Sequence, residues 1–127
     1  DRLKIARRLS EQRPPHAPDL NVCIEVNIDE EAQKAGIAPG ETADLAREIA
    51  RLPRLRLRGL MCLPAIREGF EAQREPFAAL RRLYEALNGE GLRLDTLSMG
   101  MSADYAAAIH EGATIVRIGT ALFGARE

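Results

Sequence analysis

The chain has 127 residues, 46% of them hydrophobic, which is enough for one domain core and too little for two. Its 18 basic and 19 acidic residues give a formal net charge of −1, which offers no electrostatic basis for binding nucleic acid. No apolar run approaches the roughly twenty residues that span a bilayer, and no leader segment opens the chain. We therefore expect a cytoplasmic protein with neither a nucleic-acid nor a membrane partner.

The first half of the chain alternates helix and strand. Apolar residues at helical spacing predict a helix over 3–12, which the prolines that follow bring to an end. Branched residues at alternate positions predict a strand over 21–28. A loop over 30–40 separates this strand from a helix over 42–52, for which Thr42 is the expected N-cap.

The second half continues the alternation. Its patterns predict, in order, a strand over 55–63, a helix over 70–88, a strand over 94–98, a helix over 103–111 and a strand over 114–118. Pro76 lies inside the long helical pattern. That helix therefore either starts near Glu75, with the proline in its first turn, or is kinked at the proline.

Two cysteines lie in apolar runs, and the chain begins without a methionine. Cys23 and Cys62 have no CxxC spacing and no nearby histidine, so we expect two buried free thiols and no metal site. Free thiols are typical of a reducing compartment. The missing initiator methionine, at the start of an amphipathic helix, predicts that the sequence is a fragment of a longer protein.

The expected fold class is α/β. Strands that alternate with helices pair in parallel, which gives either a doubly wound sheet or part of a closed barrel. A doubly wound sheet covers both faces with helices, whereas a barrel lumen tolerates polar side chains. We therefore predict about four parallel strands of a (β/α)8 TIM-type barrel, with Glu25, Asn27, Arg58 and Arg117 pointing into its interior. An ion pair between Glu25 and Arg58 is the specific form of this prediction.

Two strand-to-helix corners near the end of the chain carry glycines and hydroxyl side chains. They are Ser98-Met99-Gly100-Met101-Ser102 and Arg117-Ile118-Gly119-Thr120. Such corners expose backbone N–H groups, and glycine lets the backbone approach a ligand closely. Side by side, the two corners can hold one phosphate. Taken alone, each glycine also fits an ordinary turn.

Four motifs follow one another along nearly the whole chain: Val26-Asn27-Ile28 with Lys34-Ala35-Gly36, then 57–61, 97–104 and 116–124. Together they resemble the pyridoxal phosphate homeostasis protein family. That family is related in fold to the N-terminal domain of alanine racemases. The resemblance implies that residues 1–127, a single domain or fragment, form the C-terminal half of a barrel that binds pyridoxal 5'-phosphate (PLP) at its mouth.

The resemblance also implies roles for the residues of the two corners. They would form the walls of a phosphate cup: Ser98, Gly100, Met101 and Ser102 on one side, Gly119 and Thr120 on the other. Arg117 would face the pyridine nitrogen and keep it unprotonated, which suits a carrier or a racemase better than a transaminase. In the alternative reading, Ser98 and Thr120 only cap secondary structure and Arg117 only balances Glu25.

The lysine that forms the Schiff base in this family has no counterpart here. It belongs to the first strand of the barrel, which no segment of this chain matches, and neither Lys4 nor Lys34 takes its role. The resemblance therefore implies non-covalent binding of PLP, or of inorganic phosphate or sulfate, and no catalytic residue. We also expect two unpaired sheet edges to favour self-association.

Three functions stay open from the sequence. The motifs favour a non-enzymatic PLP-binding and homeostasis protein. The alternative is an alanine racemase-like enzyme domain, for which Tyr105, or Tyr84, would be the candidate acid or base. The third is a half-barrel fragment that has lost its chemistry.

Overall fold

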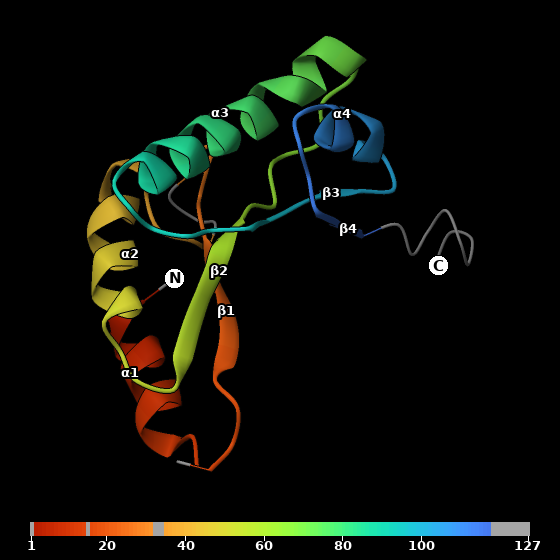
Figure 1. Ribbon diagram of the computed structural model, residues 1–127. Coiled ribbons are helices and arrows are strands. Elements are labelled where there is room, and N and C mark those ends of the chain that lie inside the picture. Colours follow the sequence, from red (N-terminus) through yellow and green to blue (C-terminus); the bar gives the residue numbers. More distant parts are fainter. Residues whose placement is uncertain (1, 15, 32–34, 118–127) are drawn as a thin grey trace.

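The computed structural model describes residues 2–14, 16–31 and 35–117, in which four helices pack on one four-stranded sheet (Figure 1). The helices are α1 (Leu3–Gln12), α2 (Thr42–Ala50), α3 (Phe70–Gly89) and α4 (Tyr105–His110), with a short 3-10 helix, η1 (Pro39–Glu41), before α2. The strands are β1 (Leu20–Glu25), β2 (Leu55–Met61), β3 (Thr96–Met101) and β4 (Ile115–Arg117). The predicted alternation of helices and strands is confirmed.

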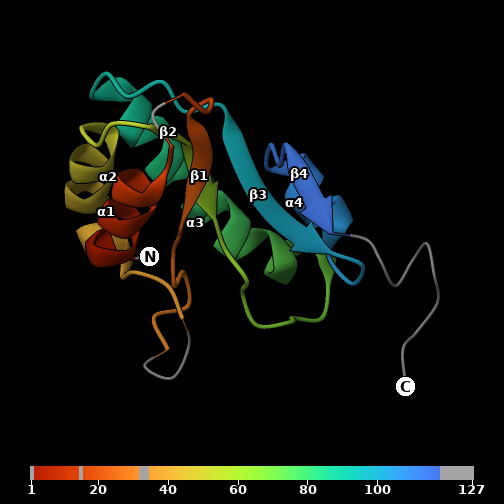
Figure 2. The ribbon, with the colours of Figure 1, turned by 90° about the horizontal axis from the view of Figure 1, so that it is seen from below.

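The sheet has the strand order of a barrel segment. All three pairings are parallel, and the strands follow one another as β1-β2-β3-β4. A doubly wound sheet would instead reverse its strand order at a switch point. Figure 2 shows the helices together on one side of this sheet. The predicted fold class, four parallel strands alternating with helices, is therefore confirmed.

The two faces of the sheet differ sharply in burial. Ile24, Leu60 and Leu97 share one register line on the helix-covered face and are at most 3% exposed. The opposite face, which we call the open face, carries Cys23, which is exposed. The prediction of two buried thiols is thus wrong for Cys23, because its side chain lies on the opposite face from that of its buried neighbour Ile24. It is confirmed for Cys62, where burial is the main cause that raises the thiol pKa to about 12.

Two helix starts differ from the sequence prediction. Thr42 is the first residue of α2, and Glu41 occupies the N-cap position. The Thr42 hydroxyl does not cap the helix but donates a hydrogen bond back to the carbonyl of Ala38 at 3.1 Å. Helix α3 begins at Phe70 and runs through Pro76, so a start near Glu75 is wrong. The cost of an internal proline is offset here by the burial of its ring.

The core lies between the helices and the face of the sheet that they cover, with α3 supplying its largest side chain. Phe77 and Leu80 of α3 are fully buried, and they belong to the same cluster as Ile24 and Leu60 of the sheet. Phe70, the first residue of α3, remains 43% exposed beside His110. The same helix therefore offers one core phenylalanine and one surface phenylalanine.

Replacing Phe77 by alanine should lower the free energy of unfolding by about 3–5 kcal/mol, because it removes a fully buried ring and leaves a cavity. Phe70→Ala is the matched control and should cost no more than about 1.5 kcal/mol. Urea unfolding followed by circular dichroism measures both. Equal losses in the two variants would contradict the placement of the core.

Candidate functional site

The candidate site lies where β3 and β4 end side by side. Ser98 pairs with Ile115 and Met101 pairs with Arg117, with an irregular register between the two pairs. Parallel strands end at the same edge of a sheet, so the corner over 98–104 lies beside Arg117. Gly119 and Thr120, the predicted second wall, fall outside the described residues.

Gly100 brings the corner into close contact with α4. Its φ is +101°, a conformation that L side chains rarely adopt. A Cβ at this position would lie 2.6 Å from the Cβ of Ala108 and 3.3 Å from a methyl carbon of Val116. Gly100 therefore serves both the backbone bend and the packing of α4 against β3.

The amide of Met101 is already engaged inside the protein. Its N–H donates to Oδ1 of Asp104 at 2.8 Å, and the Asp104 N–H donates to the Met101 carbonyl at 3.1 Å. Asp104 is only 7% exposed. The sequence reasoning missed this residue, although an aspartate three positions after Met101 is a recognisable turn-forming signal.

Ser98 and Ser102 frame the same corner. Ser98 lies in register with Met61 and Glu25, on the open face. Its carbonyl accepts a hydrogen bond from the backbone N–H of Cys62 at 3.2 Å. Ser102 is half-buried in the turn between β3 and α4. The first predicted wall is therefore a continuous piece of backbone with a serine at each end.

Arg117 lies on the open face. Its Nη2 donates to the sulfur of Met61 at 3.7 Å, which is a weak contact. Within the part of the chain that the structure describes, no carboxylate lies within ion-pair distance of Arg117, so the reading in which it balances Glu25 is wrong. A guanidinium with only a sulfur contact can still donate to a ligand.

Arg58 pairs with Asp95, and the predicted ion pair with Glu25 is wrong. Two parallel hydrogen bonds join the side chains, Nε to Oδ1 at 2.8 Å and Nη2 to Oδ2 at 2.7 Å. The backbone explains the choice, because the Asp95 N–H donates to the Arg58 carbonyl at 2.8 Å and so places the two residues together. Hydrogen bonds from Arg58 and then Thr96 lower the pKa of Asp95 to about 2.

Asn27 does not contribute to a shared interior either. Its amide nitrogen donates to the carbonyl of Glu31 at 2.6 Å, and its amide oxygen accepts from the Glu31 N–H at 3.3 Å. The side chain thus closes the turn after β1. Of the four residues predicted to point inward, the other three, Glu25, Arg58 and Arg117, lie on the open face, where Arg58 lines a hollow.

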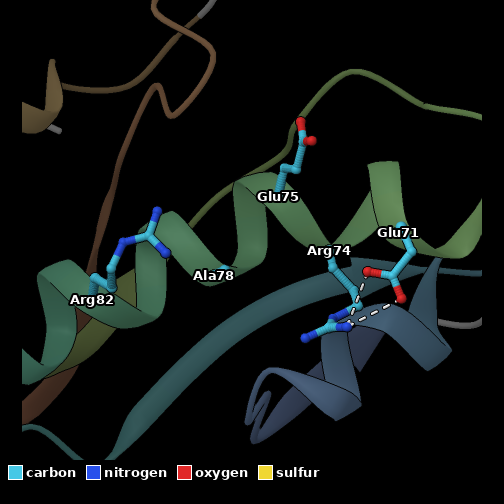
Figure 3. A pocket seen from close by; sticks show the side chains of 5 residues that line it. All are labelled: Glu71, Arg74, Glu75, Ala78 and Arg82. Atoms are coloured by element: carbon cyan, nitrogen blue, oxygen red, sulfur yellow. Dashed lines mark hydrogen bonds and ion pairs between the residues drawn. The ribbon is translucent and has the colours of Figure 1, made fainter.

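A second hollow lies on the outer surface of α3, away from the candidate site (Figure 3). It is lined by Glu71, Arg74, Glu75, Ala78 and Arg82. Arg74 forms ion pairs with Glu71, with Nη1 3.1 Å from Oε2, and with Glu111, with Nε 2.8 Å from Oε2. This hollow is therefore a solvated helix face on which Arg74 already has two carboxylate partners.

Among residues 2–14, 16–31 and 35–117, no cluster of three histidine, cysteine or acidic side chains could hold a metal ion. In the same ranges, no helix is long and apolar enough to cross a membrane.

The chain is similar to known proteins along its whole length. The sequence model described as "Alanine racemase, N-terminal domain" matches residues 1–127. The pyridoxal phosphate homeostasis protein of Pseudomonas aeruginosa is 60% identical over 127 residues, which are 100% of this chain and 54% of that protein. The chain thus spans about half the length of this curated relative.

Solved structures agree with the sequence comparison. A crystal structure of an unknown protein from Bifidobacterium adolescentis superimposes with a TM-score of 0.88 at 34% identity, over 97% of this chain and 50% of the other. PipY of Synechococcus elongatus, solved with PLP bound, gives a TM-score of 0.84 at 30% identity, over 98% of this chain and 58% of PipY.

Gly100→Ala should lower the free energy of unfolding by about 2–4 kcal/mol, because the new methyl group meets Ala108 and the positive φ becomes strained. Gly89→Ala is the control: an added Cβ there meets nothing within 4 Å, and alanine in a helix should be neutral or stabilising by about 0.5–1 kcal/mol. Thermal and urea unfolding measure both. A harmless Gly100→Ala would show that the corner is built differently.

Proposed function

The chain belongs to the family of the alanine racemase N-terminal domain, and from this membership we propose that it is the phosphate-binding part of a PLP homeostasis protein. It binds the cofactor without catalysing a reaction of its own. The observation that carries the proposal is the corner over 98–104, which ends beside a guanidinium that has no carboxylate partner among the described residues. The name of the Pseudomonas relative and the PLP-bound PipY structure support it.

The proposed cup has two walls. Ser98, Gly100, Met101 and Ser102 form the first, through a backbone that no side chain at Gly100 obstructs and through two hydroxyl groups. Gly119 and Thr120 form the second wall and remain a proposal from the sequence. Bound PLP supplies an aldehyde that condenses with amines and a ring that acts as an electron sink.

Arg117 would hold the ring of the cofactor. A guanidinium stays protonated and only donates hydrogen bonds, so a pyridine nitrogen that faces it remains an unprotonated acceptor. This weakens the ring as an electron sink and favours carriage over catalysis. Lys4 lies exposed on α1, and Lys34 falls outside the described residues, so we assign neither to covalent attachment.

The tyrosines give no support to a racemase reaction in this chain. The Tyr84 hydroxyl donates to the carbonyl of Leu94 at 2.8 Å and holds the end of α3 near β3. Tyr105 begins α4 and is 42% exposed. We therefore retain the non-enzymatic proposal, together with the sequence-based expectation of a cytoplasmic protein without a nucleic-acid partner.

The chain should bind PLP reversibly, with inorganic phosphate as a competitor. Pyridoxal, which lacks the phosphate, is the matched ligand control and should bind at least tenfold more weakly, because the cup recognises the phosphate. Isothermal titration calorimetry gives the affinities, and intact mass after borohydride reduction should show no stoichiometric adduct. Equal affinity for both ligands, a stoichiometric adduct, or interconversion of alanine enantiomers would contradict the proposal.

We also propose that the chain self-associates through its sheet. Among the described strands, β1 and β4 lie at the edges of the sheet, and Ile115 on the open face is 51% exposed. Ile115→Glu should shift the sedimentation profile toward the monomer, because it places a charge in the contact. Ile66→Glu, at a loop residue that is 75% exposed, is the control and should leave the profile unchanged. A monomeric parent chain would contradict this proposal.

A further inference from the structure

We propose that Asp104 is the positioning residue of the phosphate corner: its carboxylate holds the Met101 amide and so sets the backbone on which a phosphate rests. This inference rests on the function proposed above. It assigns a structural task to a residue that the corner motif did not single out, and it removes one backbone group from the set of phosphate donors.

Asp104 and Met101 are joined by two hydrogen bonds. Oδ1 accepts from the Met101 N–H at 2.8 Å while the Asp104 N–H donates to the Met101 carbonyl at 3.1 Å, so the two residues close a small ring. Asp104 is 7% exposed. A carboxyl group this buried is costly unless it accepts hydrogen bonds.

The Asp104 side chain bonds to β3 and not to the helix that it precedes. Asp104 occupies the N-cap position of α4, where an aspartate side chain usually accepts from the first turn of the helix. Here it makes no such bond and turns back to β3 instead. The aspartate therefore stabilises the end of the strand and leaves the start of the helix uncapped.

The surroundings place this carboxylate behind the corner, on the side of the protein interior. Burial is the main cause of the raised pKa of the Cys62 thiol, and the charges of Asp29 and Asp104 raise it further. Asp104 therefore lies near Cys62, a fully buried residue directly after β2. On the α3 side, Gln73 donates to the carbonyls of Arg67, at 3.0 Å, and Ala103, at 3.4 Å. Hydrogen bonds from Gln73 and to Asp104 therefore hold the corner on its interior side.

Two consequences follow for a bound phosphate. The Met101 N–H is already used, so Met101 contributes shape to the cup and not a backbone donor. A carboxylate behind the corner also repels a phosphate dianion, so the feature that matters at position 104 is the acceptor oxygen and not the charge. An asparagine at this position keeps the acceptor and loses the charge.

The test compares three variants of the chain. Asp104→Ala removes the acceptor, and Asp104→Asn retains it. Thr114→Val is the matched control, because the Thr114 hydroxyl oxygen accepts from the Leu97 N–H at 2.9 Å, at the other end of the same strand. The probes are inorganic phosphate and PLP, titrated into 15N-labelled chain, together with amide hydrogen exchange at Met101.

Asp104→Ala should weaken binding of both probes about tenfold and speed Met101 exchange about tenfold, the loss expected for one hydrogen bond. Asp104→Asn should bind within threefold of the parent chain or more tightly. Thr114→Val should lower stability without changing either affinity.

Three results would overturn the proposal: unchanged binding by Asp104→Ala, equal losses in the alanine and asparagine variants, or a phosphate titration that transfers the Met101 N–H from Asp104 to the ligand. Absence of saturable binding by the parent chain would instead refute the proposed function. Met101 exchange in the unliganded variants then still decides whether Asp104 holds the strand end.

Discussion

The parallel pairing of β3 with β4 is the constraint on which the candidate site depends. It joins Ser98 to Ile115 and Met101 to Arg117, residues that are distant in the sequence, and it makes both strands end at one edge. The pairing requires α4 to cross behind the sheet, and Gly100 permits this because a larger residue would meet Ala108. Local packing under the corner and the position of the guanidinium are therefore consequences of one arrangement.

The fold could be predicted from the sequence because its signals are periodic. Branched residues at alternate positions marked β1, and leucines at helical spacing marked α3, so the order of elements and the contrast between two sheet faces followed. Exact ends were less predictable. Thr42 has the chemistry of an N-cap, yet its hydroxyl bonds to Ala38, a choice made by the η1 turn that precedes it.

Partners of charged side chains were the part that the sequence could not provide. Strand spacing suggested that Arg58 would form an ion pair with Glu25. The loop before β3 instead places Asp95 beside Arg58, where two parallel hydrogen bonds join their side chains. Asp104 has a turn-forming position that the sequence does show, but the partner of its carboxylate depends on where a short turn places it. Periodicity places a residue on a face, whereas its partner depends on loop conformations that periodicity does not encode.

The pairing of Arg58 with Asp95 leaves two arginines of the open face, Arg58 and Arg117, electrically unequal. Arg58 forms a neutral unit with its carboxylate, whereas Arg117 meets only the sulfur of Met61 among the described residues. Of these two charges, the one at the carboxyl end of the sheet is therefore the one without an ion-pair partner among the described residues. A charge that no carboxylate neutralises attracts anions before any contact forms, and added salt weakens that attraction.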